Sequence, residues 1–305
     1  EPYPKKSDCH IHATLKQRLD AVHKLRFQHT IKTLCRVLRV NRSSYYKHFS
    51  SEPAPRTKEN QRIASFILRI HAEHNKRLGA YKIAYVLKRD YGIHISVGRV
   101  YRLMKSLQLP QMSTVKPSGG AKHSDNGDYT DYLNRKFSLK APDLVWVSDI
   151  TYLKAGGKWY HLCIIMDLFS RKVISWKLSA KADTGLVMDT FKRAFEKRGA
   201  PSGLMFHSDR GSQYTSFSFR QLLDSLNVVQ SFSKKGCPFD NACCECFFKY
   251  LKKEETNRRT YHSFRELQLS VFEYIDGYYN SRRPHGTLGM LTPNEAEILY
   301  QEQNQ

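Results

Sequence analysis

The stretch LVWVSDITYL, residues 144–153, decides the fold of the second half of the chain. It is rich in β-branched and aromatic residues, which is typical of a β-strand, and Asp149 ends its most apolar part. Two similar runs follow, WYHLCIIMDL at 159–168 and RKVISWKL at 171–178. Turn residues separate the runs, among them Gly156 and Gly157. We therefore expect three antiparallel strands.

Helical and strand-like segments then alternate along the chain. The pattern predicts a helix at 183–199, a strand at 203–209, a helix at 217–227, a strand at 228–232 and a helix at 242–255. This order is that of an α/β ribonuclease H-like core, a mixed five-stranded sheet flanked by helices. Asp149 would lie on the first strand and Asp209 at the end of the fourth.

Three acidic residues stand in three different local settings. Asp149 and Asp209 end strand-like runs, the latter in LMFHSDRGSQY at 204–214, whereas Glu245 lies in the helical pattern DNACCECFFKYLKKE at 240–254. Magnesium takes oxygen ligands, and two such ions about 3.5–4 Å apart activate an attacking oxygen and stabilise a leaving one. We therefore expect a two-metal phosphoryl-transfer site with two magnesium ions, for which manganese can substitute.

Other acids compete for this role. Asp167, Asp240, Glu254 and Glu255 lie near the three candidates in the sequence, but none has a comparable motif around it. Asp240 is interpreted as structural, as a helix cap. Trp146 is interpreted as a core residue rather than a stacking platform.

The charge of the chain points to a polyanionic partner. Lysine and arginine number 50 against 28 acidic residues, and residues 1–120 hold 24 basic and 7 acidic ones. Such a field favours double-stranded DNA, because each neutralised phosphate releases counterions. The alternative is a basic surface that serves only solubility. No apolar run approaches the roughly 20 residues that span a bilayer, so no membrane partner is expected.

Cysteine usage indicates reduced thiols. The chain has seven cysteines, and Cys243, Cys244 and Cys246 fall within one helical stretch. This arrangement suits neither a disulfide framework nor a standard zinc pattern, although metal binding remains the alternative.

Composition shifts divide the chain into segments. Two helical segments each have a helix cap before the last helix, Asn41 and Ser96, and linkers rich in Pro, Gly and Ser follow them. The expected order is a helix-turn-helix unit at 1–49, a linker at 50–57, a second helix-turn-helix domain at 58–108, a flexible linker at 109–130, the catalytic core at 131–281, and a basic turn with a short helix at 282–305.

The last helix of the second unit is the expected recognition helix. Arg99, Arg102 and Lys105 recur every three residues and share one face. The residues expected to face inward are Val97, Val100, Leu103 and Leu107. The alternative is a solvated basic face without a DNA contact.

At four motifs the chain resembles the OrfB-type transposases of bacterial insertion sequences of the IS-three group. The motifs are WVSDITYL, HSDRGSQY, DNACCECFFKYLKKE and YYNSRRPHGTLGMLTPNEA. LCRVLRVNRSSYYKH and LGAYKIAYVLKRDYG resemble the two helix-turn-helix units of that group. The resemblance implies a retroviral integrase-like core that cuts the ends of the element and joins them to DNA. It also implies a bacterial, cytoplasmic and nucleoid-associated protein.

The resemblance also implies roles for single residues. Asp149 and Asp209 would bind the shared metal pair, Glu245 would complete the second metal's shell, and Lys252 would hold a phosphate beside the metals. Two DNA ends must be brought together, so a homodimer or higher assembly is expected on terminal-repeat and target DNA. The further DNA contacts that we expect are Arg42, Tyr81, Lys82, Arg99, Arg102, Lys105, His207, Arg210, Gln213, Lys249, Arg282, Arg283 and His285.

Two rival functions share these features. A non-catalytic helix-turn-helix regulator would need no acidic triad, yet all three acids are present. Another ribonuclease H-like nuclease has less need of paired helix-turn-helix units to recognise duplex sequence. Both rivals are therefore less favoured than a transposase.

Overall fold

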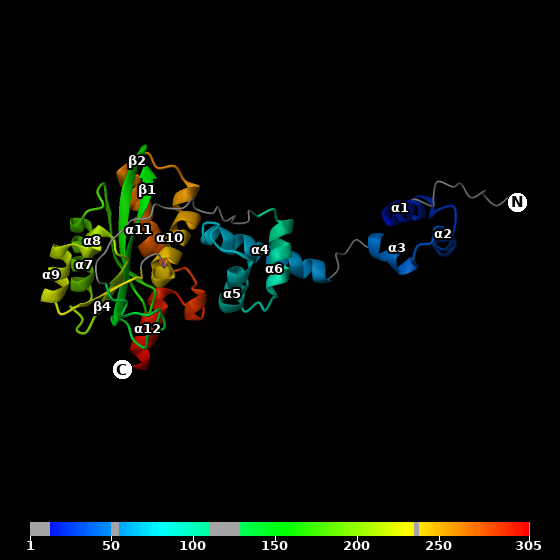
Figure 1. Cartoon of the computed structure of the whole chain (residues 1–305). Helices are drawn as coiled ribbons and strands as arrows, with labels where there is room; N and C mark the ends of the chain where they lie inside the picture. Colours follow the sequence, from blue (N-terminus) through cyan, green and yellow to red (C-terminus); the bar gives the residue numbers. More distant parts are fainter. Residues whose placement is uncertain (1–12, 50–54, 110–128, 235–237, 305) are drawn as a thin grey trace. The chain divides into compact units, whose positions relative to one another are not determined.

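The computed structural model describes residues 13–49, 55–109, 129–234 and 238–304, and its helices and strands are labelled in Figure 1. The chain forms two compact units, one of Glu1–Glu73 with Ser96–Leu109 and the other of His74–Ile95 with Pro110–Gln305. The linker expected at 50–57 is shorter than expected, because a helix already begins at Pro55. Proline is tolerated in the first turn, where its missing N–H has no partner to lose.

Three short helices form a small core near the N-terminus. They are α1 (Leu15–Leu25), α2 (Ile31–Val37) and α3 (Arg42–Phe49). Buried side chains of all three, including Leu19, Leu34 and Tyr45, pack together. The expected cap at Asn41 is confirmed, because its side chain accepts the Ser43 N–H at 3.0 Å.

The first unit also contains α4 (Pro55–Glu73) and α6 (Val97–Ser106). Ser96 caps α6 as expected, by accepting the Arg99 N–H at 3.3 Å. The expected inward face of α6 is partly wrong. Val100 and Met104, one helical turn apart, are its buried residues, whereas Val97 is 40% exposed in the first turn.

The second unit begins with α5 (Ala80–Tyr91), which buries Ile83, Val86 and Leu87. The helix ends at Gly92, whose φ of 64° is left-handed and whose N–H returns to the Leu87 carbonyl. Glycine adopts this conformation without the penalty that a Cβ brings.

A five-stranded mixed sheet organises the second unit. Its strands are β1 (Val145–Ala155), β2 (Lys158–Asp167), β3 (Val173–Ser179), β4 (Met205–Ser208) and β5 (Val229–Phe232), in the order β3-β2-β1-β4-β5. The first three pair antiparallel, and β4 runs parallel to β1 and β5. The predicted ribonuclease H-like sheet is confirmed.

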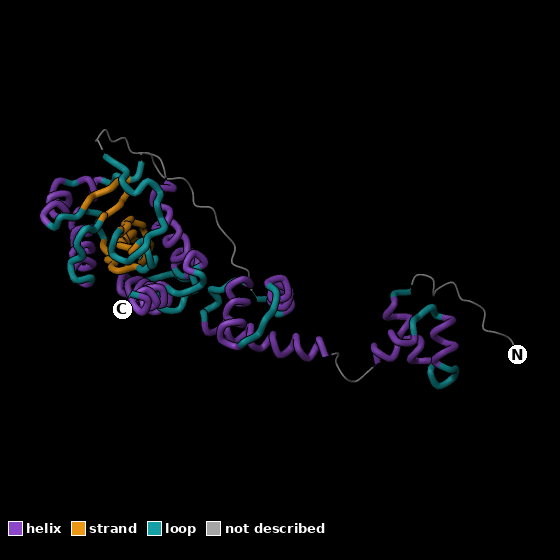
Figure 2. Tube along the Cα trace, turned by 90° about the horizontal axis from the view of Figure 1, so that it is seen from below, coloured by secondary structure: helices purple, strands orange, loops and turns teal. Residues whose placement is uncertain are grey.

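Helices cover both faces of the sheet. On one side lie α7 (Thr184–Lys197), α8 (Ser212–Thr215) and α9 (Phe217–Ser225), and on the other α10 (Ala242–Glu254) and α11 (Phe264–Tyr274), as Figure 1 shows. Figure 2 shows the strands, in orange, enclosed by these helices. The 3₁₀ turns Pro238–Asn241, Thr256–Arg258 and Gly286–Leu288, the π-helical turn Ile275–Tyr279 and α12 (Pro293–Gln303) complete the described structure.

Alternate residues of β1 pack on opposite faces of the sheet. Val145 and Val147 pack with Phe247 and Leu251 of α10, whereas Trp146 packs with Phe191 of α7. The interpretation of Trp146 as a core residue is confirmed, because it is fully buried. Among the described residues, no helix is both long and apolar enough to cross a membrane.

Candidate active site

Strand pairing places two of the candidate acids at the same level. In β1 and β4 the last matched residues are Val147 and His207. Asp149 comes two residues later on β1 and so points to the same face as Val147, and Asp209 comes two residues after His207, directly past the end of β4 at Ser208. For Asp149 this is the face of Val145 and Val147, which α10 covers.

The first turn of α10 carries Glu245 over this face. Cys244, Phe247 and Leu251 anchor the helix in the core, whereas Glu245 remains exposed. Asn241, just before the helix, donates its side-chain N–H to the Ser148 carbonyl at 2.9 Å. It thereby ties the start of α10 to the residue next to Asp149. The role of Asn241 has no signal in the sequence, because only the fold shows that it bonds to β1.

Electrostatic effects connect Asp149 with three other groups. Burial, followed by the negative charges of Asp209 and Glu245, raises the pKa of Asp149 to about 8, and the positive charge of Lys252 opposes this rise. Burial likewise lowers the pKa of Lys252, against the attraction of Asp149. Lys252 also lies over the ring of Tyr152, with Nζ 4.8 Å from the centroid. Asp209, Glu245 and Lys252 therefore each lie within electrostatic reach of Asp149.

The donor set at this place consists of carboxylate oxygens. Asp149 accepts the Ile150 N–H at 2.7 Å, and Asp209 accepts the Gly211 N–H at 3.0 Å, each through Oδ1. No salt bridge to Asp149, Asp209 or Glu245 is found among the described residues. Carboxylate oxygens that form no salt bridge fit a hard divalent ion. Within the described part of the chain, however, no three His, Cys, Asp or Glu side chains are already close enough to hold one.

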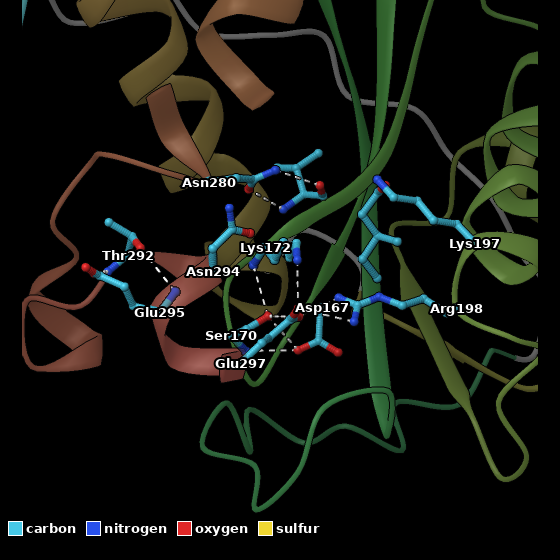
Figure 3. Close-up of polar contacts among 12 residues, drawn as sticks. Asp167, Ser170, Lys172, Lys197, Arg198, Asn280, Thr292, Asn294, Glu295 and Glu297 are labelled. Carbon is cyan, nitrogen blue, oxygen red and sulfur yellow. Dashed lines mark hydrogen bonds and ion pairs between the residues drawn. The ribbon is translucent and has the colours of Figure 1, made fainter. Parts of the chain in front are cut away.

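The competing acids are held by structural contacts. Asp167, at the end of β2, accepts the Asp143 N–H at 2.7 Å and the Ser170 N–H at 2.9 Å. The Ser170 hydroxyl in turn donates to the carboxylate of Glu297, as Figure 3 shows. Glu297 also pairs with Lys172 and Arg198. Asp167 therefore belongs to a network that attaches α12 to the sheet.

The remaining competitors have cationic partners. Asp240 is buried, pairs with Arg135 at 2.6 Å and accepts the Lys234 N–H at 2.9 Å. Its structural role is confirmed, although it does not cap a helix. Glu254 binds Arg283, and Glu255 binds Arg77.

The described cysteines are free, as predicted. These are Cys35, Cys163, Cys243, Cys244 and Cys246. Cys243 lies 2.6 Å from a guanidinium nitrogen of Arg171, whereas Cys244 is buried beside β1. Cys9 and Cys237 lie outside the described residues.

Family comparisons agree with this arrangement. Models described as Integrase core domain match residues 140–238 and 226–293, and one described as HTH-like domain matches 58–116. The transposase for insertion sequence element IS904 of Lactococcus lactis is 33% identical over 80% of this chain and 97% of its own length. Transposase InsF for insertion sequence IS3A of Escherichia coli is 31% identical over 90% and 96%. The chain belongs to the IS3-family transposases.

This IS3-family transposase is therefore a DDE enzyme that cleaves DNA strands and joins them in a reaction dependent on a divalent metal. The catalytic core domain of BIV integrase is 16% identical over 53% of this chain and 98% of its own, with a TM-score of 0.40. The family assignment rests on the sequence relatives.

Most basic residues predicted to contact DNA are at least partly exposed in the transposase, but some of the predicted contact residues already bond to other groups of the protein. Arg99 pairs with Glu59 at 2.7 Å, the Gln213 amide donates to the Ala182 carbonyl at 2.7 Å, and Arg210 donates to the Ser233 carbonyl at 2.9 Å. Lys82 is half-buried, and burial lowers its pKa to about 8. Exposed on the surface are Arg42, Tyr81, Arg102, Lys105, Lys249 and Arg282.

Three predicted DNA contacts are wrong, because their side chains are buried in the second unit. The ring nitrogens of His207 bond to Ser231 and Ser233 at 2.9 and 3.1 Å. Arg283 is 3% exposed and makes a two-pronged contact with Glu254. His285 lies edge-on against Tyr279, with ring centroids 4.7 Å apart. These side chains stabilise the fold and do not reach solvent.

Proposed function

We propose that Asp149, Asp209 and Glu245 hold two magnesium ions that this transposase uses to cut the ends of its element and join them to DNA. The observation that carries the proposal is the shared level of Asp149 and Asp209 on parallel strands, beneath a helix that carries Glu245 and Lys252. Manganese substitutes for magnesium, because both are hard cations that accept carboxylate oxygen.

Each side chain has a separate task in this proposal. Asp149 on β1 and Asp209, directly after β4, form the rigid part of the site. Glu245 sits in the first turn of α10 and completes the site when DNA is bound. The ions, when bound, activate the attacking oxygen and stabilise the leaving one. No side-chain nucleophile is needed, since water attacks first and the released 3′-hydroxyl attacks the second phosphodiester.

Lys252 positions the DNA strand. Its position near Asp149 and over Tyr152 places a cation beside the acids. A phosphate held there would lie next to the reacting bond, and such positioning lowers the entropic part of the barrier.

The remaining basic residues bind the duplex. We assign terminal-repeat recognition to the helix-turn-helix segments at 1–49 and 58–108, with Arg42, Arg102 and Lys105 exposed for contact. A match to an HTH-like domain supports the second segment. Two ends must be held at once, so the active form is at least a homodimer on DNA.

Strand joining by acid variants tests the proposal. Labelled duplexes that end in the terminal repeat are incubated with magnesium and the wild type, Asp149→Asn, Asp209→Asn or Glu245→Gln. Loss of a ligand should lower the joining rate by about a hundredfold or more, since even the outer partners of metal ligands are worth 10–100-fold. Glu273→Gln, an exposed acid on α11, is the matched control and should join normally. A triad variant that joins at the control rate would overturn the assignment.

A further inference from the structure

A cavity of about 560 Å³ in the second unit is lined in part by Lys252 and has no role in the reaction proposed above. It lies between the far end of the β1–β2 hairpin and the segment that follows α10. Its polar lining includes Lys154, Lys252 and Arg259, and no acidic side chain lines it within the described part of the chain. Arg259 also pairs with the buried Glu255 at 3.3 Å but keeps about half of its side chain exposed. The cavity is therefore suited to an anion. Its volume is within the range of about 300–1,000 Å³ that small-ligand sites have.

Two exposed aromatic rings stand at this cavity. Tyr152 is 58% exposed and Trp159 is 55% exposed, although both belong to strands of the central sheet. Their rings meet edge to face, with centroids 5.3 Å apart at 87°. Lys252 lies over the tyrosine ring and Lys154 over the indole, with Nζ 4.8 and 5.8 Å from the centroids. Aromatic faces beside cations are how proteins bind the bases and phosphates of single strands.

The cavity walls are fixed to each other. The Gly156 N–H at the hairpin turn donates to the Tyr261 carbonyl at 2.8 Å. A Cβ at Gly156 would lie 2.8 Å from the His262 carbonyl oxygen, and its φ of 53° is left-handed, so only glycine fits this contact. The hairpin is thereby tied to the segment after α10. The cavity is formed before any ligand arrives, which reduces the entropic cost of binding.

We propose that this cavity binds an unpaired nucleotide of the DNA strand that passes the acids, with its base on Tyr152 and Trp159 and its phosphate toward Lys154 and Arg259. A paired base has both faces covered by its neighbours in the stack and cannot use the rings. Lys252 links the cavity to Asp149, so the bound nucleotide lies close to the cut. The inference rests on the proposed function for the identity of the strand.

Tryptophan fluorescence of the full chain provides a direct test, without metal and without any reaction. Trp146 is fully buried and Trp176 is half-buried with its N–H donated to Asp276 at 3.0 Å, so Trp159 is the most exposed of the three indoles. Titration with a short single-stranded oligothymidylate should quench the wild-type emission, and blunt duplex should quench it much less. In Trp159→Phe the quench should disappear. A quench that survives in Trp159→Phe, or that duplex matches, would overturn the proposal.

Affinity variants separate stacking from general charge. Tyr152→Ala should raise the oligonucleotide concentration needed for half-quench between about fivefold and a hundredfold, the range that one lost base–aromatic stack gives. Phe217→Ala removes a 74% exposed aromatic ring elsewhere on the same unit and should leave the titration unchanged. Equal effects of both substitutions would contradict specific binding of the nucleotide in this cavity.

The proposed function and this inference fail separately. Asp149→Asn should still show the quench, because the cavity does not need the acid. Normal joining by that variant would overturn the metal assignment and leave the nucleotide cavity intact. An absent quench in a wild type that joins DNA would instead overturn the cavity alone.

Discussion

Asp149 on β1 and Asp209 after β4 lie at matching positions, each two residues past the last paired residues of two parallel strands. Parallel strands carry their residues forward in register, so the acids on both lie at the same edge of the core. The second half of the site comes from α10, which Asn241 ties to β1. The sheet therefore fixes two acids, and one helix brings the third acid and the lysine.

Substitution of Lys252 should weaken DNA binding in a salt-dependent way. If Lys252 holds one phosphate, Lys252→Ala should reduce the slope of log affinity against log salt by about one, because one fewer counterion is released. The measurement is fluorescence anisotropy with labelled terminal-repeat DNA over a salt series. Lys192→Ala on α7, on the other side of the sheet, is the control. An unchanged slope in Lys252→Ala would argue against a phosphate contact.

Loss of Arg283 should destabilise the second unit strongly. Its guanidinium contacts both oxygens of Glu254 at 2.7–3.1 Å, and the carboxylate also accepts the Tyr274 hydroxyl at 2.8 Å. Arg283→Ala leaves Glu254 buried without its cation, a change that costs about 3–5 kcal/mol in the free energy of unfolding. Urea unfolding measures the loss. Arg265→Ala, an exposed arginine on α11, should change it by less than about 0.5 kcal/mol. Similar losses in both variants would refute the buried pair.

The burial of His285 should make folding sensitive to acid. Its pKa falls from 6.5 to about 2, first through burial and then through the positive charge of Arg283. Below about pH 6.5, His285 therefore binds a proton in the unfolded chain but stays neutral in the folded chain. The contribution of His285 to the free energy of unfolding should be constant above this pH and decrease below it, by up to about 1.4 kcal/mol per pH unit.

His285→Phe isolates this share. Phenylalanine keeps a ring against Tyr279 and cannot be protonated. Urea unfolding between about pH 5 and 8 should show a shallower acid slope in the variant than in the wild type. Identical slopes would mean that His285 does not titrate on unfolding.

The sequence predicts the sheet and the acids well, because both depend on local patterns. The run around Asp149 is rich in β-branched and aromatic residues, and turn residues follow it, so its strand and its antiparallel partner follow directly. The buried face of the recognition helix is predicted less well. The sequence predicts its cap, Ser96, but the buried face of α6 includes Met104 instead of Val97.

The burial of His207 and Arg283 could not be predicted, since it depends on partners that are distant in the sequence. His207 stands two residues before Asp209 in the sequence, yet its ring bonds to Ser231 of β5 and to Ser233 just after that strand. Arg283 belongs to a basic turn that looks exposed, and only the fold places Glu254 against it. The exposure of Tyr152 and Trp159 could not be predicted either. Both aromatics flank the Gly156–Gly157 turn in the sequence, but an aromatic residue on a strand is usually part of a core.

The central claim is that Asp149, Asp209 and Glu245 meet around divalent ions when DNA is bound. The most direct measurement is anomalous diffraction from manganese in crystals of the protein with terminal-repeat DNA. The account predicts anomalous peaks within about 2.0–2.2 Å of carboxylate oxygens of Asp149 and Asp209, with Glu245 ligating one of them. Peaks that avoid these three carboxylates, in a complex that joins DNA in solution with manganese, would contradict it.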